Sequence, residues 1–256
     1  MAEAAALRIV ICGLEHSGTT LCADLLRQAD GLDGRFELGV LLGASPRDFP
    51  RVPDFYQYFA PSWGLAPADE RTVLDTDDFA AFYGRLLARS AALRPGTTTL
   101  FDKTPRYLSV LSACLARVQA PFVVTWKDPR AIVHSDFQRA GAADFDAWFA
   151  DYAHPKLAYL RQCYAEFQRH RAAPRVLALP LEELCLAAGA SCEKLFAHAG
   201  LRFHPRYLAL RDLRYPNTRP GSVNAGAPFE FWHAFSRLHI AAIERHFAEF
   251  GDWFYD

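Results

Sequence analysis

The chain has 256 residues, of which 51% are hydrophobic and 22% are charged. A chain of this length and composition buries most of its surface in its own core, which excludes a disordered protein and a small disulfide-stapled scaffold. The formal net charge is −1, so the chain lacks the broad basic surface of non-specific nucleic-acid binding proteins. At this size we expect one domain over residues 1–256.

The composition also bears on location and on metal content. The first 13 residues lack a basic segment followed by an apolar stretch of about 7–15 residues, which a signal peptide would have. No apolar run reaches the roughly 18 residues of a membrane span. The 6 cysteines form no CxxC pair and read as small buried side chains in a reducing compartment. We therefore expect a cytoplasmic protein without a bound metal.

Short apolar segments alternate with segments of helical periodicity along the chain. In chain order, the pattern predicts a strand over 7–12, helices over 19–28 and 77–93, a strand over 98–101, a helix over 105–117, a strand over 121–126, helices over 129–139, 145–152 and 155–171, a strand over 175–179, helices over 181–188 and 191–199, and a long helix over 230–250. This alternation is typical of an α/β fold, a P-loop-like parallel β-sheet flanked by helices on both faces.

Residues 45–69 carry five prolines, which excludes one regular helix over the whole segment. The segment is also rich in aromatic side chains: Phe49, Phe55, Tyr56, Tyr58, Phe59 and Trp63. A lid or substrate wall and simple packing against the core both account for this composition.

The first strand and the next helix are joined by the pattern G-x-x-x-x-G-T-T over residues 13–20. Glycines permit a tight turn, and the N–H groups from Ser17 to Thr20 can point at a phosphate at the positive end of the helix. Hydroxyl donors come from Ser17, Thr19 and Thr20. A nucleoside triphosphatase would have lysine at position 19. The structural alternative is a plain glycine turn with a Ser/Thr helix cap.

A second basic constellation directly follows the strand predicted at 121–126. It contains Lys127, Ser135 and Arg139, and the last two share one face if the segment is helical. A phosphate dianion requires a cation and directed hydroxyl donors, which this set supplies. The alternative is a solvated basic face.

Together, the S-G-T-T loop and the K-D-P-R-A-I-V-H-S segment resemble the sulfotransferases that use 3′-phosphoadenosine 5′-phosphosulfate (PAPS), and most closely the tyrosylprotein and glycan sulfotransferases. The resemblance implies that Glu15, His16, Ser17, Gly18, Thr19 and Thr20 cradle the 5′-phosphosulfate. It implies that Lys127, Ser135 and Arg139 hold the 3′-phosphate. The family commonly has Arg or Lys at the position of His16 and usually has Arg at that of Lys127.

The resemblance is clear over residues 9–139 and also implies catalytic roles. Glu37, the one carboxylate between Asp33 and Asp48, matches the glutamate that acts as general base. Lys103 and His16 match groups that stabilise charge on the transferring oxygens. An ordinary exposed glutamate and a surface lysine or histidine are the alternatives.

Two further expectations concern residues near this constellation. Asp102 is a candidate ion-pair partner of Lys103, its neighbour in the chain. Asn224 and Gly226 belong to a C-terminal segment, 219–226, that resembles the loop closing over the nucleotide in the family.

The implied reaction is sulfuryl transfer from PAPS to a hydroxyl of a small molecule or a carbohydrate, with release of adenosine 3′,5′-bisphosphate (PAP) and no metal. A Mg²⁺-dependent P-loop kinase or nucleotide hydrolase is the alternative enzyme, although it would normally carry the missing lysine. A catalytically silent nucleotide-binding or scaffold protein on the same fold is the alternative from another class. The sequence specifies no oligomeric state.

Overall fold

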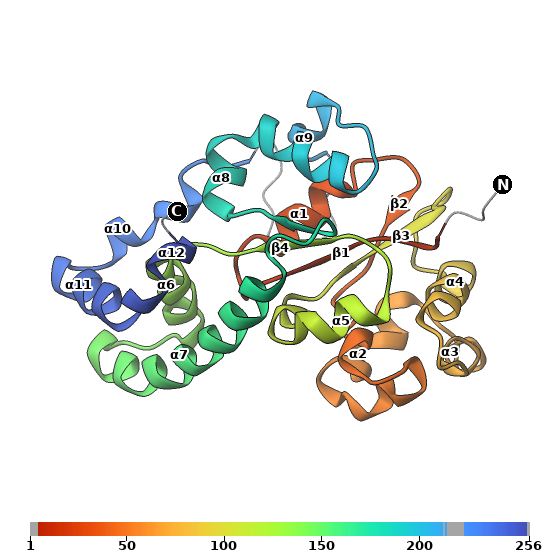
Figure 1. The fold of residues 1–256 in the computed structure, drawn as a ribbon, viewed down its shortest axis with the longest axis horizontal. Coiled ribbons are helices and arrows are strands. Elements are labelled where there is room, and N and C mark those ends of the chain that lie inside the picture. The colour runs from red at the N-terminus through yellow and green to blue at the C-terminus, as the bar shows by residue number, and fades with distance from the viewer. Residues whose placement is uncertain (1–4, 212, 214–222, 255–256) are drawn as a thin grey trace.

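The computed structural model describes residues 5–211, 213 and 223–254 and contains a parallel sheet of five strands (Figure 1). The strands are β1 (Leu7–Gly13), β2 (Leu32–Asp33), β3 (Thr99–Lys103), β4 (Phe122–Thr125) and β5 (Val176–Ala178), in the order β2-β3-β1-β4-β5. Every neighbouring pair is parallel. The four predicted strands are confirmed, and β2 adds a fifth that is too short to show a periodic pattern.

Helices occupy most of the remaining described chain. They are α1 (Thr19–Leu26), α2 (Pro53–Trp63), α3 (Pro67–Leu74), α4 (Phe79–Arg89), α5 (Leu111–Arg117), α6 (Pro129–Ala140), α7 (Phe145–His170), α8 (Leu181–Leu186), α9 (Ala188–His198), α10 (Phe231–Ala234), α11 (Arg237–His246) and α12 (Gly251–Phe254). Within the described ranges, no helix combines the length and the apolar character needed to cross a membrane.

The two faces of the sheet support separate apolar cores because successive strand residues point to opposite sides. On one face, Ile9 and Ile11 of β1 pack with side chains of α1 and α9. On the other face, Val10 and Cys12 pack with side chains of α4, α5 and α7. Figure 1 shows α1, α8 and α9 on one side of the sheet and α2, α5 and α7 on the other. The predicted α/β fold with helices on both faces is confirmed.

Three helical predictions differ from the structure. Residues 105–110 of the predicted helix over 105–117 form a 3₁₀-helix, and the α-helix α5 begins only at Leu111. Residues 145–170 form one helix, α7, that continues through Pro155, although a proline removes one backbone donor and predicts a break. The predicted long helix over 230–250 is wrong, because the chain is extended at Phe235 and Ser236 between α10 and α11. Ser236 caps α11 by accepting a hydrogen bond from the His239 N–H. Tertiary packing at Pro155 and the cap at Ser236 therefore determine helix boundaries that the apolar periodicity alone predicts incorrectly.

The proline-rich segment folds as separate short helices, as its composition requires. Both α2 and α3 begin on a proline, where the missing N–H costs nothing. Phe59 and Trp63 are buried in the core, whereas Tyr58 is half exposed. The segment thus contributes both core packing and an exposed aromatic side chain.

The carboxyl ends of the central strands lie together at one edge of the sheet. Gly13 at the end of β1 is in register with Thr125 of β4, and Ile11 is in register with Lys103 of β3. In open parallel sheets this edge is where ligands bind. The loops after β1, β3 and β4 therefore meet at the edge that carries the predicted site residues.

Candidate functional site

The loop after β1 is fixed to the end of β4. A Cβ atom on Gly13 would come within 2.2 Å of the Thr125 carbonyl oxygen, so only glycine fits there. The Leu14 N–H donates to that same oxygen over 2.9 Å. The buried Ser17 hydroxyl lies 3.0 Å from the Thr125 carbonyl oxygen and 2.9 Å from the Thr125 hydroxyl. The Ser17 N–H donates to Leu14, so both donors of Ser17 serve the loop itself.

Helix α1 begins directly after this loop. Gly18 has φ +92, a left-handed conformation, and a Cβ there would come within 2.6 Å of the Leu181 side chain. No side chain caps the helix. The N–H groups of Thr19 and Thr20 belong to the first turn, where no intrahelical acceptor exists. These donors and the positive end of the helix form an anion-binding geometry.

His16 lies in the loop with φ 62 and is partly exposed. Its Nε2 is 3.7 Å from Oδ1 of Asp136 on α6. Burial and then the nearby Arg139 charge lower the pKa of His16 to about 4, although Asp136 acts in the opposite direction. His16 is therefore neutral at physiological pH in the ligand-free protein. Glu15, its neighbour, is half-buried.

The structure brings Lys127 and Ser135 into direct contact. Lys127 follows β4, and Asp128 caps α6. Ser135 lies two turns along that helix, where its Oγ accepts a hydrogen bond from the Lys127 Nζ over 2.6 Å. Lys127 is 5% exposed. Burial lowers the pKa of its ammonium group to about 8, with Asp136 opposing the shift. A buried lysine next to a hydroxyl group is a geometry suited to one phosphate.

Arg139 lies four residues beyond Ser135 on α6 and is exposed. Burial is the largest cause of the lowered pKa values of His16 and Lys127, and the Arg139 charge lowers both further. Arg139 therefore lies within electrostatic reach of the loop and of the end of β4. The residues predicted from two separate motifs therefore share one electrostatic environment.

Two of the three residues predicted for catalysis, Glu37 and Lys103, are also in contact. Lys103 ends β3 and is 3% exposed, and its Nζ donates to Oε1 of Glu37 over 2.9 Å. The chain around Glu37 is anchored to β3, because the Gly39 N–H donates to Thr104 Oγ1 over 3.0 Å. Gly39 has φ +74, and a Cβ there would come within 2.3 Å of the Phe55 ring.

Asp102 has a different role from the predicted ion pair with Lys103. It is buried, and its carboxylate accepts hydrogen bonds from the Tyr83 and Tyr107 hydroxyls, over 2.6 and 2.9 Å, and from Thr104 over 3.1 Å. Neighbouring residues of a strand point to opposite faces, which directs Asp102 away from Lys103. Burial raises the pKa of Asp102 to about 6, and these hydrogen bonds oppose the shift. Asp102 therefore fixes the Thr104 hydroxyl, which in turn accepts the hydrogen bond from the Gly39 N–H near Glu37.

Phe36, which precedes Glu37, belongs to no sequence motif but lies at the site. Phe36 is 46% exposed and forms an edge-to-face pair with Tyr58 of α2, with ring centroids 5.9 Å apart. The Lys103 Nζ lies 5.7 Å from the Phe36 ring centroid. The exposed Phe36 ring therefore lies beside the Lys103–Glu37 pair, and Tyr58 packs against that ring. The only sequence signal was the position of Phe36 next to the predicted base.

Asn224 and Gly226 form an exposed turn in which the Gly226 N–H donates to Asn224 Oδ1 over 2.9 Å. Residues 219–222 of the same predicted loop lie outside the described residues. Among the described residues, neither Asn224 nor Gly226 hydrogen-bonds to the loop after β1, so their role as nucleotide ligands stays a prediction.

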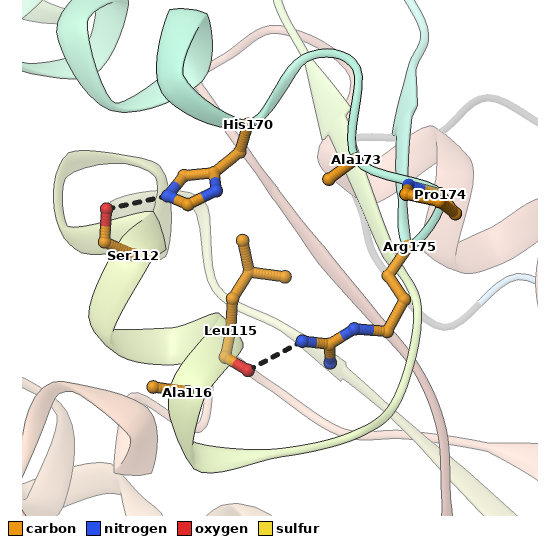
Figure 2. Close-up of a pocket in the computed structure, with 7 residues that line it drawn as sticks. All are labelled: Ser112, Leu115, Ala116, His170, Ala173, Pro174 and Arg175. Atoms are coloured by element: carbon orange, nitrogen blue, oxygen red, sulfur yellow. Dashed lines mark hydrogen bonds between the residues drawn. The ribbon is translucent and has the colours of Figure 1, made fainter.

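A crevice of about 310 Å³ lies at the opposite edge of the sheet (Figure 2). It is formed by α5, the end of α7 and the residues that lead into β5. Arg175 donates to the Leu115 carbonyl oxygen over 2.9 Å, and Ser112 Oγ lies 2.8 Å from His170 Nε2. None of the predicted site residues lines this crevice.

The fold is similar to solved sulfotransferase structures. The sulfotransferase domain of the Synechococcus PCC 7002 olefin synthase superposes with a TM-score of 0.65 at 18% identity, covering 94% of each chain. A mouse sulfotransferase in complex with PAP gives 0.57 at 13% identity, covering 95% of this chain and 84% of the other. Retinol dehydratase, in complex with androsterone and PAP, gives 0.50 at 13% identity, covering 97% and 81%.

The sequence comparisons give a family rather than an individual relative. No curated protein matches the chain by sequence. The sequence profile of the sulfotransferase family matches residues 8–205, which is well over half of the chain. The chain therefore belongs to the sulfotransferase family.

Proposed function

We propose that this protein uses PAPS to transfer a sulfuryl group to a hydroxyl of a small-molecule or carbohydrate acceptor, releasing PAP. The observation that carries the proposal is the Lys103–Glu37 contact at 2.9 Å, at the same sheet edge as the loop after β1 and the Lys127–Ser135 pair. These three features supply a base, a sulfuryl-binding group and two anion sites.

The nucleotide assignment rests on the two anion sites. Gly18 and the first turn of α1 offer backbone donors to the 5′ end of the nucleotide. Lys127 and Ser135 offer a cation and a hydroxyl group to the 3′-phosphate. The chain has Thr19 where a nucleoside triphosphatase has its lysine, which favours PAPS over a nucleoside triphosphate.

The catalytic assignment follows from the contact between Glu37 and Lys103. Glu37 would accept the proton of the acceptor hydroxyl while that oxygen attacks sulfur and the bond from sulfur to the PAP oxygen breaks. Lys103, held at the end of β3, would stabilise the charge on the transferring oxygens and on the leaving oxygen. Its hydrogen bond to Glu37 orients the base before the acceptor arrives.

The acceptor class is supported by the exposed rings beside the base. Phe36, the neighbour of Glu37 in the chain, and Tyr58, which packs against Phe36, are exposed aromatic side chains suited to a ring or an apolar skeleton that carries a hydroxyl. Retinol dehydratase, a structure of similar fold, is described as binding androsterone together with PAP.

The proposal is tested in two stages. Calorimetry in EDTA should detect PAP binding, with 5′-AMP weaker by about one to two decades, the value of one charge-assisted phosphate contact. PAP release from PAPS should then be measured in EDTA with a panel of phenols, alcohols and sugars. Equal affinity for PAP and 5′-AMP would remove the 3′-phosphate site. Binding only of ATP with Mg²⁺ would indicate a kinase or hydrolase, and PAP binding without turnover would indicate a silent nucleotide-binding protein.

A further inference from the structure

Asp136 on α6 joins the loop after β1 to α7. Its Oδ1 is 3.7 Å from His16 Nε2, and its Oδ2 is 2.9 Å from the Nζ of Lys156. The Tyr152 hydroxyl donates to the same carboxylate over 2.6 Å. His16 and Lys156 are thus bridged by one carboxyl group, which brings a lysine from the middle of α7 to the edge of the loop.

The environment of Lys156 is unusual for a lysine. The residue is 8% exposed, and its ammonium group lies 5.8 Å from the Tyr152 ring centroid and 5.6 Å from that of Tyr159. A buried ion pair contributes little to stability relative to apolar packing, because desolvation offsets the attraction. The Lys156–Asp136 pair is therefore poorly explained by folding alone.

Three cations, Lys127, Arg139 and Lys156, act electrostatically on His16 beside this pair. Burial is the largest cause of the lowered pKa values of Lys127 and His16. In addition, the charges of Lys156 and Arg139 lower the pKa of Lys127, and the charges of all three cations lower the pKa of His16. The cations are thus close enough to repel one another, while Asp136 and Glu182 act in the opposite direction on Lys127. A phosphate dianion bound between the cations would relieve this repulsion.

We propose that Lys156 is a nucleotide-binding residue whose ammonium group stabilises the 5′-phosphosulfate of PAPS beside His16. This inference rests on the proposed function and adds α7 to a nucleotide site otherwise built from the β1–α1 and β4–α6 connections. Asp136 holds the ammonium group in place before the nucleotide binds.

The test compares two nucleotides in two variants by calorimetry without Mg²⁺. Lys156→Met should weaken PAP and 5′-AMP alike, by about 10- to 100-fold, because both carry the 5′-phosphate. Lys127→Met should weaken PAP by a similar factor and leave 5′-AMP within a few-fold. Lys194→Met is the matched control, because Lys194 is 56% exposed on α9 and pairs with Glu183. It should bind both nucleotides as the wild type does.

A rescue variant separates charge from packing. In His16→Lys combined with Lys156→Met, the positive charge moves to the loop, and PAP affinity should return to within about tenfold of the wild type. If Lys156→Met fails to fold, Asp136→Asn is compared with Asp136→Asn combined with Lys156→Gln, which leaves no unpaired buried carboxylate. The double variant should bind PAP about 10- to 100-fold more weakly than Asp136→Asn.

The outcomes separate this inference from the proposed function. Unchanged PAP and 5′-AMP affinity in folded Lys156→Met, or equal affinity in the two Asp136→Asn backgrounds, would overturn the role of Lys156 alone. Failure of the wild-type protein to bind PAP would overturn both proposals.

Discussion

At the scale of single residues, the contact between Glu37 and Lys103 leads to a direct test of the base. Glu37→Gln keeps the size of the side chain but cannot take up a proton at neutral pH. We expect PAP affinity within a few-fold of the wild type and turnover slower by about 10²–10⁴-fold. Single-turnover kinetics with any accepted acceptor measures the loss.

Glu193→Gln serves as the control, since Glu193 is an exposed glutamate on α9. It should keep full turnover. A Glu37→Gln enzyme that retains most of its turnover would show that another group takes the proton.

Lys127 predicts a pH dependence of nucleotide binding. Burial lowers the pKa of Lys127 to about 8, and a bound phosphate would raise that pKa because it favours the charged form. Above pH 8 the free protein must therefore take up a proton on binding, and PAP affinity falls as the pH rises. We expect an affinity about tenfold lower at pH 9 than at pH 7, measured by calorimetry.

Lys127→Arg keeps the charge and remains protonated at pH 9. Its PAP affinity should be flat from pH 7 to pH 9. A decline of the same size in Lys127→Arg would assign the titration to a different group. His16 adds no slope between pH 7 and pH 9 in the free protein, since its pKa is about 4.

At the scale of elements, the β1–α1 connection depends on a glycine that touches β4. Gly13→Ala would force a Cβ within 2.2 Å of the Thr125 carbonyl oxygen, so the strand end or the loop must move. We expect a stability loss of about 1–3 kcal/mol and a larger loss of PAP binding, because the loop donors shift. Urea denaturation and calorimetry measure the two effects.

Gly84 provides the opposite case within the same fold. It lies in the middle of α4, and a Cβ there meets nothing within 4 Å. Gly84→Ala should therefore stabilise the protein by about 0.5–1 kcal/mol and leave PAP binding unchanged. If Gly13→Ala matched Gly84→Ala in both measurements, the close approach of β1 to β4 would not matter for the site.

The elements also show where sequence reasoning succeeds and where it stops. Central strands such as β4 are apolar on both faces and bounded by turn residues, so the pattern identifies them. The pattern predicts a helix break near Pro155 and an unbroken helix through Ser236, and both predictions are wrong. The packing of α7 carries the helix through a proline, and the Ser236 cap interrupts an apolar periodicity. Such outcomes depend on neighbours that the local sequence does not contain.

At the scale of the whole molecule, a site residue can be predicted from the sequence when its partners are close to it in the chain, and not when they are distant. The loop after β1 and the Lys127–Ser135 pair are local motifs, so their spacing together with the family resemblance predicts them. Adjacency in the chain predicts an ion pair between Asp102 and Lys103, whereas the strand directs Asp102 to Tyr83 and Tyr107. Lys156 carries no motif, and only the approach of α7 to Asp136 reveals it.

The span of these contacts has a consequence for how activity arises during folding. The Lys103–Glu37 bond joins residues 66 apart, and the contact between Ser17 and Thr125 joins residues 108 apart. Closing such long loops is entropically costly, so contacts of this kind form late and together. A fragment that ends before β4 would lack the support of the loop after β1. Appearance of nucleotide binding during refolding therefore reports that β3 and β4 have joined β1, and a nascent chain stays inactive until β4 has been added.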